Sequence, residues 1–116
     1  MKPKQTPVTY ACIAAALFAL VLSADAYAVD VEAAQALAKQ NNCFRCHGID
    51  KDKDGPAWRK IAAKFKAMPN AEQKLTNHLT SGEKAKFPDG HEEDHKILKS
   101  DDPAETKNLV DWILSL

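Results

Sequence analysis

The sequence predicts an all-α domain built from four to five short helices. Four segments carry apolar residues at the spacing of a helix, and residues that start or stop helices bound most of them. No segment alternates apolar and polar residues as a strand would, and no internal repeat is present. The 16 basic and 16 acidic side chains balance, and no basic stripe suggests binding to nucleic acid. We therefore expect a helical protein whose partners are not nucleic acids.

Residues 1–28 have the features of a secretory signal peptide. Two lysines precede an uninterrupted apolar run over residues 11–22, and the sequence ending at Ala28 has the small residues typical of a cleavage site. The run of 12 residues is too short to span a bilayer, which takes about 20. Cleavage would leave an 88-residue domain, residues 29–116, with 14 basic and 15 acidic side chains. We expect export to the periplasm.

The first helix is expected over residues 30–41. Asp30 can cap its N-terminus, and Glu32 lies in the first turn, where the helix dipole favours an anion. The apolar stripe at helical spacing consists of Val31, Ala34, Leu37 and Ala38. Because two of these side chains are alanines, the stripe permits close approach by another helix.

The run Cys43-Phe44-Arg45-Cys46-His47 follows the first helix and is the most informative motif of the chain. Cys-x-x-Cys-His is the attachment signature of c-type haem. Its two thiols can reach the two vinyl groups of one haem, and the adjacent imidazole can bind the iron. Removal of Cys12 with the signal peptide would leave no third thiol. The motif predicts one covalently bound haem c per chain, which would also supply core to so small a domain.

Three other interpretations of this motif were weighed. Two cysteines in an oxidising compartment often form a disulfide, but the histidine directly after them favours haem. A tetrahedral zinc site needs a fourth ligand or a water, and adjacent Cys46 and His47 would have difficulty reaching one small ion. A thioredoxin-like redox motif lacks its strand-helix-strand context.

A second and a third helix follow the motif. The second is expected over residues 56–66 and begins at Pro56; its apolar face consists of Trp58, Ile61 and Phe65. The third is expected over residues 71–81 and ends at Gly82, a residue type common at helix C-termini. Its buried side consists of Leu75 and Leu79, with His78 beside them either packing or facing solvent.

The last helix has the clearest signals. Asp102 is a suitable N-cap, Pro103 suits the first helical position, and Glu105 follows three residues after the cap. Its apolar edge consists of Leu109, Trp112, Ile113 and Leu116, and the first helix is the available packing partner. The preceding residues 82–100 have no clear period, and a loop of this length in a compact domain is usually functional or disordered. We expect a functional loop.

Taken together, these residues resemble the class I, or mono-haem, bacterial cytochromes c of the c551/c5 kind. The resemblance covers essentially all of residues 29–116: a helix into the haem motif, then Asp54-Gly55-Pro56-Ala57-Trp58, and finally Leu109-Val110-Asp111-Trp112-Ile113. It implies the cytochrome c fold, with four to five short helices around one covalently bound haem and the first and last helices crossing near Trp112.

The resemblance also implies roles for particular residues. Cys43 and Cys46 would form thioethers to the haem, and His47 would be the proximal iron ligand. The other ring nitrogen of His47 would donate to the backbone carbonyl of Pro56, as partners of metal-bound histidines generally accept. The haem pocket would be lined by Trp58 and Phe65.

The chain departs from this family at the sixth iron ligand. The family places a methionine in the loop before the last helix, but the only methionine after residue 28 is Met68, just 21 residues after the histidine of the motif. The loop instead contains His91 and His95, and His95 lies 17 residues before Trp112, close to where the family's methionine would align. We predict His95 as the distal ligand, with His91 second and Lys96 third. The alternatives are an open site and two histidines exposed on an acidic loop.

The expected function is one-electron transfer in the periplasm. Imidazole in place of a methionine thioether should stabilise ferric iron and give a low reduction potential. Partners would be redox proteins that dock transiently, and we expect a monomer that meets membranes only through partner complexes. A positive docking face, or only a solvated surface, could be formed by Lys60, Lys64 and Lys66 of the second helix with Lys51 and Lys53 of the loop before it. The alternative function is a haem-based sensor with an open or displaceable distal site; no arrangement typical of an enzyme is present.

Overall fold

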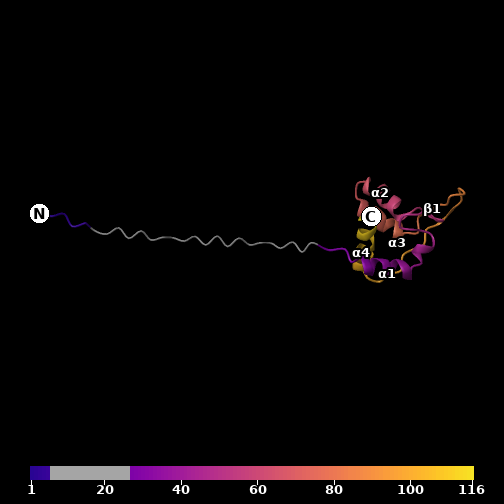
Figure 1. Cartoon of the computed structure of the whole chain (residues 1–116), viewed down its shortest axis with the longest axis horizontal. Coiled ribbons are helices and arrows are strands. Elements are labelled where there is room, and N and C mark those ends of the chain that lie inside the picture. The colour runs from indigo at the N-terminus through magenta and orange to yellow at the C-terminus, as the bar shows by residue number, and fades with distance from the viewer. Residues whose placement is uncertain (6–26) are drawn as a thin grey trace.

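The computed structural model describes residues 1–5 and 27–116 (Figure 1). The elements in chain order are α1 (Val31–Gln40), a single 3-10 turn η1 (Cys43–Arg45), α2 (Trp58–Lys66), α3 (Ala71–Thr80), β1 (Lys84–Lys86), β2 (Glu92–Asp94) and α4 (Pro103–Leu114). Most of the expected signal peptide lies outside the described residues. Within those residues, no helix is both long and apolar enough to cross a membrane.

The caps that the sequence predicts for α1 and α4 are present. The carboxylate of Asp30 accepts a hydrogen bond from the N–H of Ala33 at 2.9 Å, and that of Asp102 accepts from Ala104 at 2.8 Å. Each bond satisfies a donor that has no partner within its own helix. Helix α2 begins two residues later than expected, at Trp58, because the backbone of Ala57 is extended, with ψ of 144°. The N–H of Trp58, which has no acceptor within the helix, donates to the carbonyl of Gly48 at 2.9 Å.

Helices α1 and α4 pack against each other, as the small-residue stripe predicts (Figure 1). Ala34 and Ala38 of α1 are completely buried, whereas Val31 at the start of the stripe remains 48% exposed. Asn108 of α4 fastens the start of α1: the N–H of Asp30 donates to Asn108 Oδ1 at 2.8 Å, and Asn108 Nδ2 donates to the Asp30 carbonyl at 2.8 Å.

The core continues from this helix pair to α2 through aromatic rings. Trp58 and Trp112 meet edge to face with ring centroids 4.7 Å apart, and both are 2% exposed. Phe44 of the haem motif also packs against Trp58, with ring centroids 4.7 Å apart. Aromatic pairs in this geometry add to the burial of apolar area. The motif is therefore anchored in the same core as the helices that surround it.

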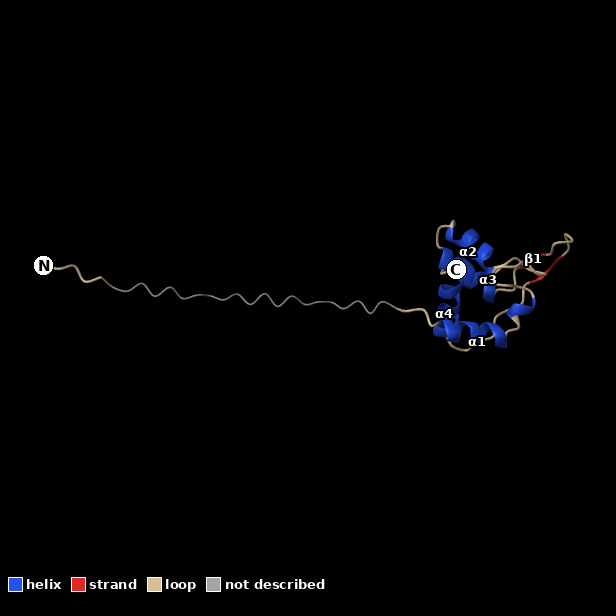
Figure 2. Cartoon of the chain, viewed as in Figure 1, coloured by secondary structure: helices blue, strands red, loops and turns tan. Residues whose placement is uncertain are grey.

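The expectation that the chain contains no strands is wrong. β1 and β2 form a two-stranded antiparallel hairpin within residues 82–100, with Lys84 opposite Asp94 and Lys86 opposite Glu92 (Figure 2). Both strands are short, and their residues are exposed except for half-buried Ala85. The pairing is supported by an ion pair from Lys84 Nζ to Asp94 Oδ1 at 2.6 Å and by a turn in which Gly90 has φ of 92°.

Candidate haem site

One large cavity of about 1080 Å³ lies among the helices and opens to solvent beside the hairpin. It is at the upper end of the range for ligand pockets, about 300 to 1,000 Å³. Helices α2, α3 and α4 contribute to its wall, together with the haem motif, the hairpin and the segment after β2, whereas α1 contributes only its C-cap residue Asn41. The apolar part of the wall includes Trp58, Ile61, Phe65, Leu75, Leu109 and Ile113. A large planar apolar group matches a wall of this kind.

The 3-10 turn η1 places both cysteines of the motif at the cavity. The N–H of Cys46 and the N–H of His47 both donate to the carbonyl of Cys43, at 3.2 and 3.0 Å, so that Cys43, Cys46 and His47 share one tight turn. All three residues border the cavity. The two cysteines are free thiols. Burial raises the pKa of the Cys43 thiol, with Lys96 opposing the shift.

His47 is held by the carbonyl that the sequence analysis proposed. Its Nδ1 lies 2.7 Å from the backbone oxygen of Pro56. Because a carbonyl can only accept, Nδ1 carries the proton and Nε2 of the neutral ring is left with a free lone pair. Burial lowers the pKa of His47, and the Pro56 carbonyl opposes that shift. The ring is therefore suited to bind a metal through Nε2.

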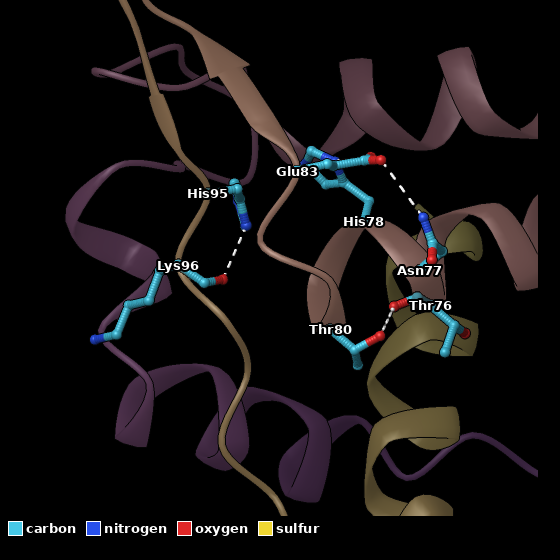
Figure 3. Close-up of polar contacts among 7 residues, drawn as sticks. All are labelled: Thr76, Asn77, His78, Thr80, Glu83, His95 and Lys96. Carbon is cyan, nitrogen blue, oxygen red and sulfur yellow. Dashed lines mark hydrogen bonds and ion pairs between the residues drawn. The ribbon is translucent and has the colours of Figure 1, made fainter.

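His95 has the same arrangement on the segment after β2. Its Nδ1 lies 2.9 Å from the backbone oxygen of Lys96 (Figure 3). Burial lowers the pKa of His95, and the neighbouring His78 lowers it further. The neutral ring again has its proton on Nδ1 and a free lone pair on Nε2, and the residue borders the cavity.

The ring centroids of His47 and His95 lie 6.2 Å apart. Two imidazoles that bind one metal ion from opposite sides, each with a metal–nitrogen bond of about 2.0 Å, would have ring centroids about 6 Å apart. The observed spacing matches this value. The two histidines, the two thiols and the apolar wall therefore fit a haem attached at the motif.

The other candidates for the distal ligand are placed differently. His91 lies at the end of the hairpin, outside the cavity wall, where its Nδ1 contacts Asp89 and its Nε2 lies 3.2 Å from Glu93 Oε1. Its ring stacks on Phe87 at 4.4 Å. Lys96 borders the cavity. Met68, at the end of α2, borders the cavity and packs against the core.

His78, which was expected either to pack or to face solvent, lies at the site. It borders the cavity, and its ring centroid lies 4.4 Å from that of His95. Its Nδ1 lies 2.5 Å from Glu83 Oε1, and Asn77 Nδ2 donates to Glu83 Oε2 at 3.4 Å (Figure 3). In the sequence, a place for His78 at the site is indicated only by its position between Leu75 and Leu79, the buried residues of α3.

Several lysines of the expected docking face have partners within the protein. Lys60 Nζ pairs with the carboxylate of Asp52, and Lys53 Nζ donates to the carbonyl of Phe44 at 2.6 Å. Lys66 Nζ donates to the carbonyl of Leu116 at 3.3 Å. These contacts account for part of the charge on that side of the molecule without any external partner.

Fold and site together define a small helical protein that attaches one haem through Cys-x-x-Cys-His. Residues 31–116 match the family model described as cytochrome c, and the chain belongs to that family. The chain is 33% identical to cytochrome c-551 of Pseudomonas aeruginosa over 106 residues, which is 91% of this chain and 95% of that one. Proteins of this family bind haem c covalently, which confirms the expected cofactor and excludes the zinc and thioredoxin interpretations of the motif. They carry electrons and are not enzymes, as expected for this chain.

Solved structures show the same fold. The class 1 cytochrome MtoD from Sideroxydans lithotrophicus ES-1 is 62% identical, with a TM-score of 0.71 over 76% of this chain and 97% of that one. Wild-type cytochrome c552 of Nitrosomonas europaea is 32% identical, with a TM-score of 0.57 over 71% of this chain and 98% of that one. The expected fold class is thereby confirmed, and the chain is a mono-haem electron carrier of class I.

Proposed function

We propose that this cytochrome carries single electrons at low reduction potential, with His47 and His95 as the two axial ligands of a haem bound to Cys43 and Cys46. The haem supplies the one-electron redox change. Cys43 and Cys46 would fix its position, Trp58 and Phe65 would exclude water from one side, and the two imidazoles would set the electron density at the iron.

The observation that carries this proposal is the matched pair of histidines. Each ring has Nδ1 held by a backbone carbonyl and Nε2 free, and the centroids are 6.2 Å apart. His91 lacks these properties, because both of its ring nitrogens contact carboxylates at the hairpin tip. Among the described residues, His95 is therefore the better supported distal ligand.

A low potential follows from the ligand chemistry. A methionine thioether raises the potential of cytochromes c, so its replacement by imidazole should favour the ferric state. Hydrogen bonds from Nδ1 to carbonyls increase the basicity of a ligating imidazole and act in the same direction. We expect a potential well below that of methionine-ligated relatives.

We further propose that the protein works in the periplasm, as a monomer that docks transiently on redox proteins and reaches membranes only through their complexes. The signal-like residues 1–28 support export, and the mature protein would be residues 29–116. N-terminal sequencing of protein recovered from the periplasm should begin at Val29. An N-terminus at Met1 in membrane fractions would contradict this.

Electron paramagnetic resonance of the ferric protein tests the ligands directly. The wild type should give a low-spin signal typical of two imidazoles. His95→Ala should convert this signal to high spin and admit carbon monoxide to the reduced iron, whereas the matched control His91→Ala should change neither. A high-spin wild type that binds carbon monoxide would instead support the sensor function, and an unchanged His95→Ala spectrum would exclude His95.

A further inference from the structure

A buried side-chain amide joins the end of α1 to the segment that carries His95. Asn41 is 4% exposed and lies two residues before Cys43. Its Oδ1 accepts a hydrogen bond from the N–H of Lys99 at 2.8 Å, and its Nδ2 donates to the carbonyl of Lys99 at 3.2 Å. The amide thus pairs with both backbone groups of one residue, as a neighbouring strand would, across 58 positions of sequence.

The segment from His95 to Lys99 has no helix or strand of its own and is held by other parts of the chain. The N–H of His95 donates to the carbonyl of Glu83 at 2.9 Å, and that of Leu98 donates to the carbonyl of Leu79 at 2.8 Å. These bonds tie the segment to the start of the hairpin and to α3. The pair of bonds from Asn41 ties it to α1, directly beside the haem-attaching cysteines.

The residue type at position 41 suits this contact. Asn41 uses its oxygen for Lys99 and shares its amide hydrogens between Lys99 and the carbonyl of Leu37, at 3.0 Å. A leucine of similar size would leave the N–H and the carbonyl of Lys99 without these partners, which is costly because the contact is partly buried. An aspartate would keep an acceptor for the N–H but would lose the donor.

We propose that Asn41 is a positioning residue that holds His95 on the iron. Because Asn41 fixes the position of Lys99, it limits how far the segment can move away from the cavity. It thereby sets how often the bond between His95 and the haem iron breaks. This inference rests on the proposed function, since it requires His95 to be the distal ligand.

The chain offers a matched control for this proposal. Asn108 is also buried, at 6% exposure, and makes the same two-bond contact with the backbone of Asp30. It joins α4 to the opposite end of α1 and does not border the cavity. Loss of either amide removes one partly buried two-bond contact with a distant backbone, and loss of Asn41 also removes its bond to Leu37, but only Asn41 acts on the segment that carries His95.

The test uses the ferric, haem-loaded protein mixed with increasing cyanide. At saturating cyanide the rate of binding reaches a limit set by dissociation of the distal ligand. Asn41→Leu should raise this limiting rate about tenfold or more, the factor that corresponds to loss of one buried hydrogen bond. Asn108→Leu should leave the limiting rate within about twofold of the wild-type rate. It should nevertheless lower the thermal stability by about as much as Asn41→Leu does, because it loses the same kind of contact.

Equal limiting rates in the two leucine variants, or a rate in Asn41→Leu equal to that of the wild type, would overturn the proposal. If Asn41→Leu fails to take up haem, the limiting rate of cyanide binding is compared instead between Asn41→Asp and its control, Asn108→Asp. The same outcomes then support or overturn the proposal. The ferric spectrum of His95→Ala separates the two proposals. An unchanged spectrum removes His95 as the ligand and refutes both, whereas a changed spectrum with equal cyanide rates refutes the role of Asn41 alone.

Discussion

Substitution of Gly55 by alanine should directly disturb His47, the proposed proximal ligand. A Cβ atom at Gly55 would lie 2.5 Å from Cε1 and 2.8 Å from Nδ1 of His47. Ordinary carbon contacts begin at about 3.5 Å, so the ring or the loop would have to move by about 1 Å. The same ring donates from Nδ1 to the carbonyl of Pro56, the next residue along the chain. The added methyl group therefore acts on both the position of the ring and its hydrogen bond.

The expected magnitude comes from the cost of overpacking, about 1 to 3 kcal/mol. A domain of this size loses about 4 to 8 °C of Tm for each kcal/mol, so the Tm of Gly55→Ala should fall by about 5 to 20 °C. A weaker bond to Pro56 reduces the basicity of the His47 imidazole. Because a less basic ligand favours ferric iron less, the reduction potential should rise.

Thermal unfolding followed by circular dichroism and a redox titration of the same sample would measure both effects. Gly90→Ala is the matched control: its Cβ would meet no atom within 4 Å, and its φ of 92° adds only backbone strain, of about 1 kcal/mol, at the hairpin tip. The control should leave the potential unchanged. A Gly55→Ala protein with the Tm and the potential of the wild type would refute the reasoning.

Two further changes test the core and the hairpin. Trp112→Ala removes a ring that is 2% exposed and packs edge-on against Trp58. Denaturant unfolding should therefore show that the free energy of unfolding falls by about 3 to 5 kcal/mol, and a fall of less than about 1 kcal/mol would contradict this packing. Hydrogen bonds that the His91 ring donates to the carboxylates of Asp89 and, secondarily, Glu93 raise the pKa of His91 above its usual 6.5. The contribution of His91 to stability is therefore present below pH 6.5 and fades as the pH rises through the raised pKa. Proton NMR should show this midpoint, and Asp89→Asn should lower it; an unchanged midpoint would exclude Asp89 as the cause.

The helices could be predicted from the sequence because their signals are local. Asp30 and Asp102 cap the helices that they were expected to cap, since an N-cap acts on donors only two or three residues away. Gly82 follows α3 with a φ of 70°, the left-handed conformation that a helix end favours. The haem motif is likewise a contiguous run, so its chemistry could be predicted without a fold.

The hairpin and the role of His78 could not be predicted, because both depend on tertiary structure. Lys-Ala-Lys and Glu-Glu-Asp have low strand propensity and no apolar alternation, and the pairing is supported instead by opposite charges across the strands. His78 lies on an ordinary helical stripe, and only the position of α3 beside the cavity brings its ring to 4.4 Å from His95. The sequence around His78 indicates only that it lies near the buried side of its helix, and the sequence of the hairpin has no strand pattern.

The contact between α1 and α4 has a consequence for the order of events during synthesis. These are the first and last helices of the domain, and the bonds between Asp30 and Asn108 join residues 78 positions apart. Contacts of such long sequence separation form slowly, and this one cannot form before the C-terminal residues exist. Cys43 and Cys46, in contrast, emerge early. We therefore expect the thiols of Cys43 and Cys46, the proposed attachment sites, to stay accessible until the last helix packs against the first.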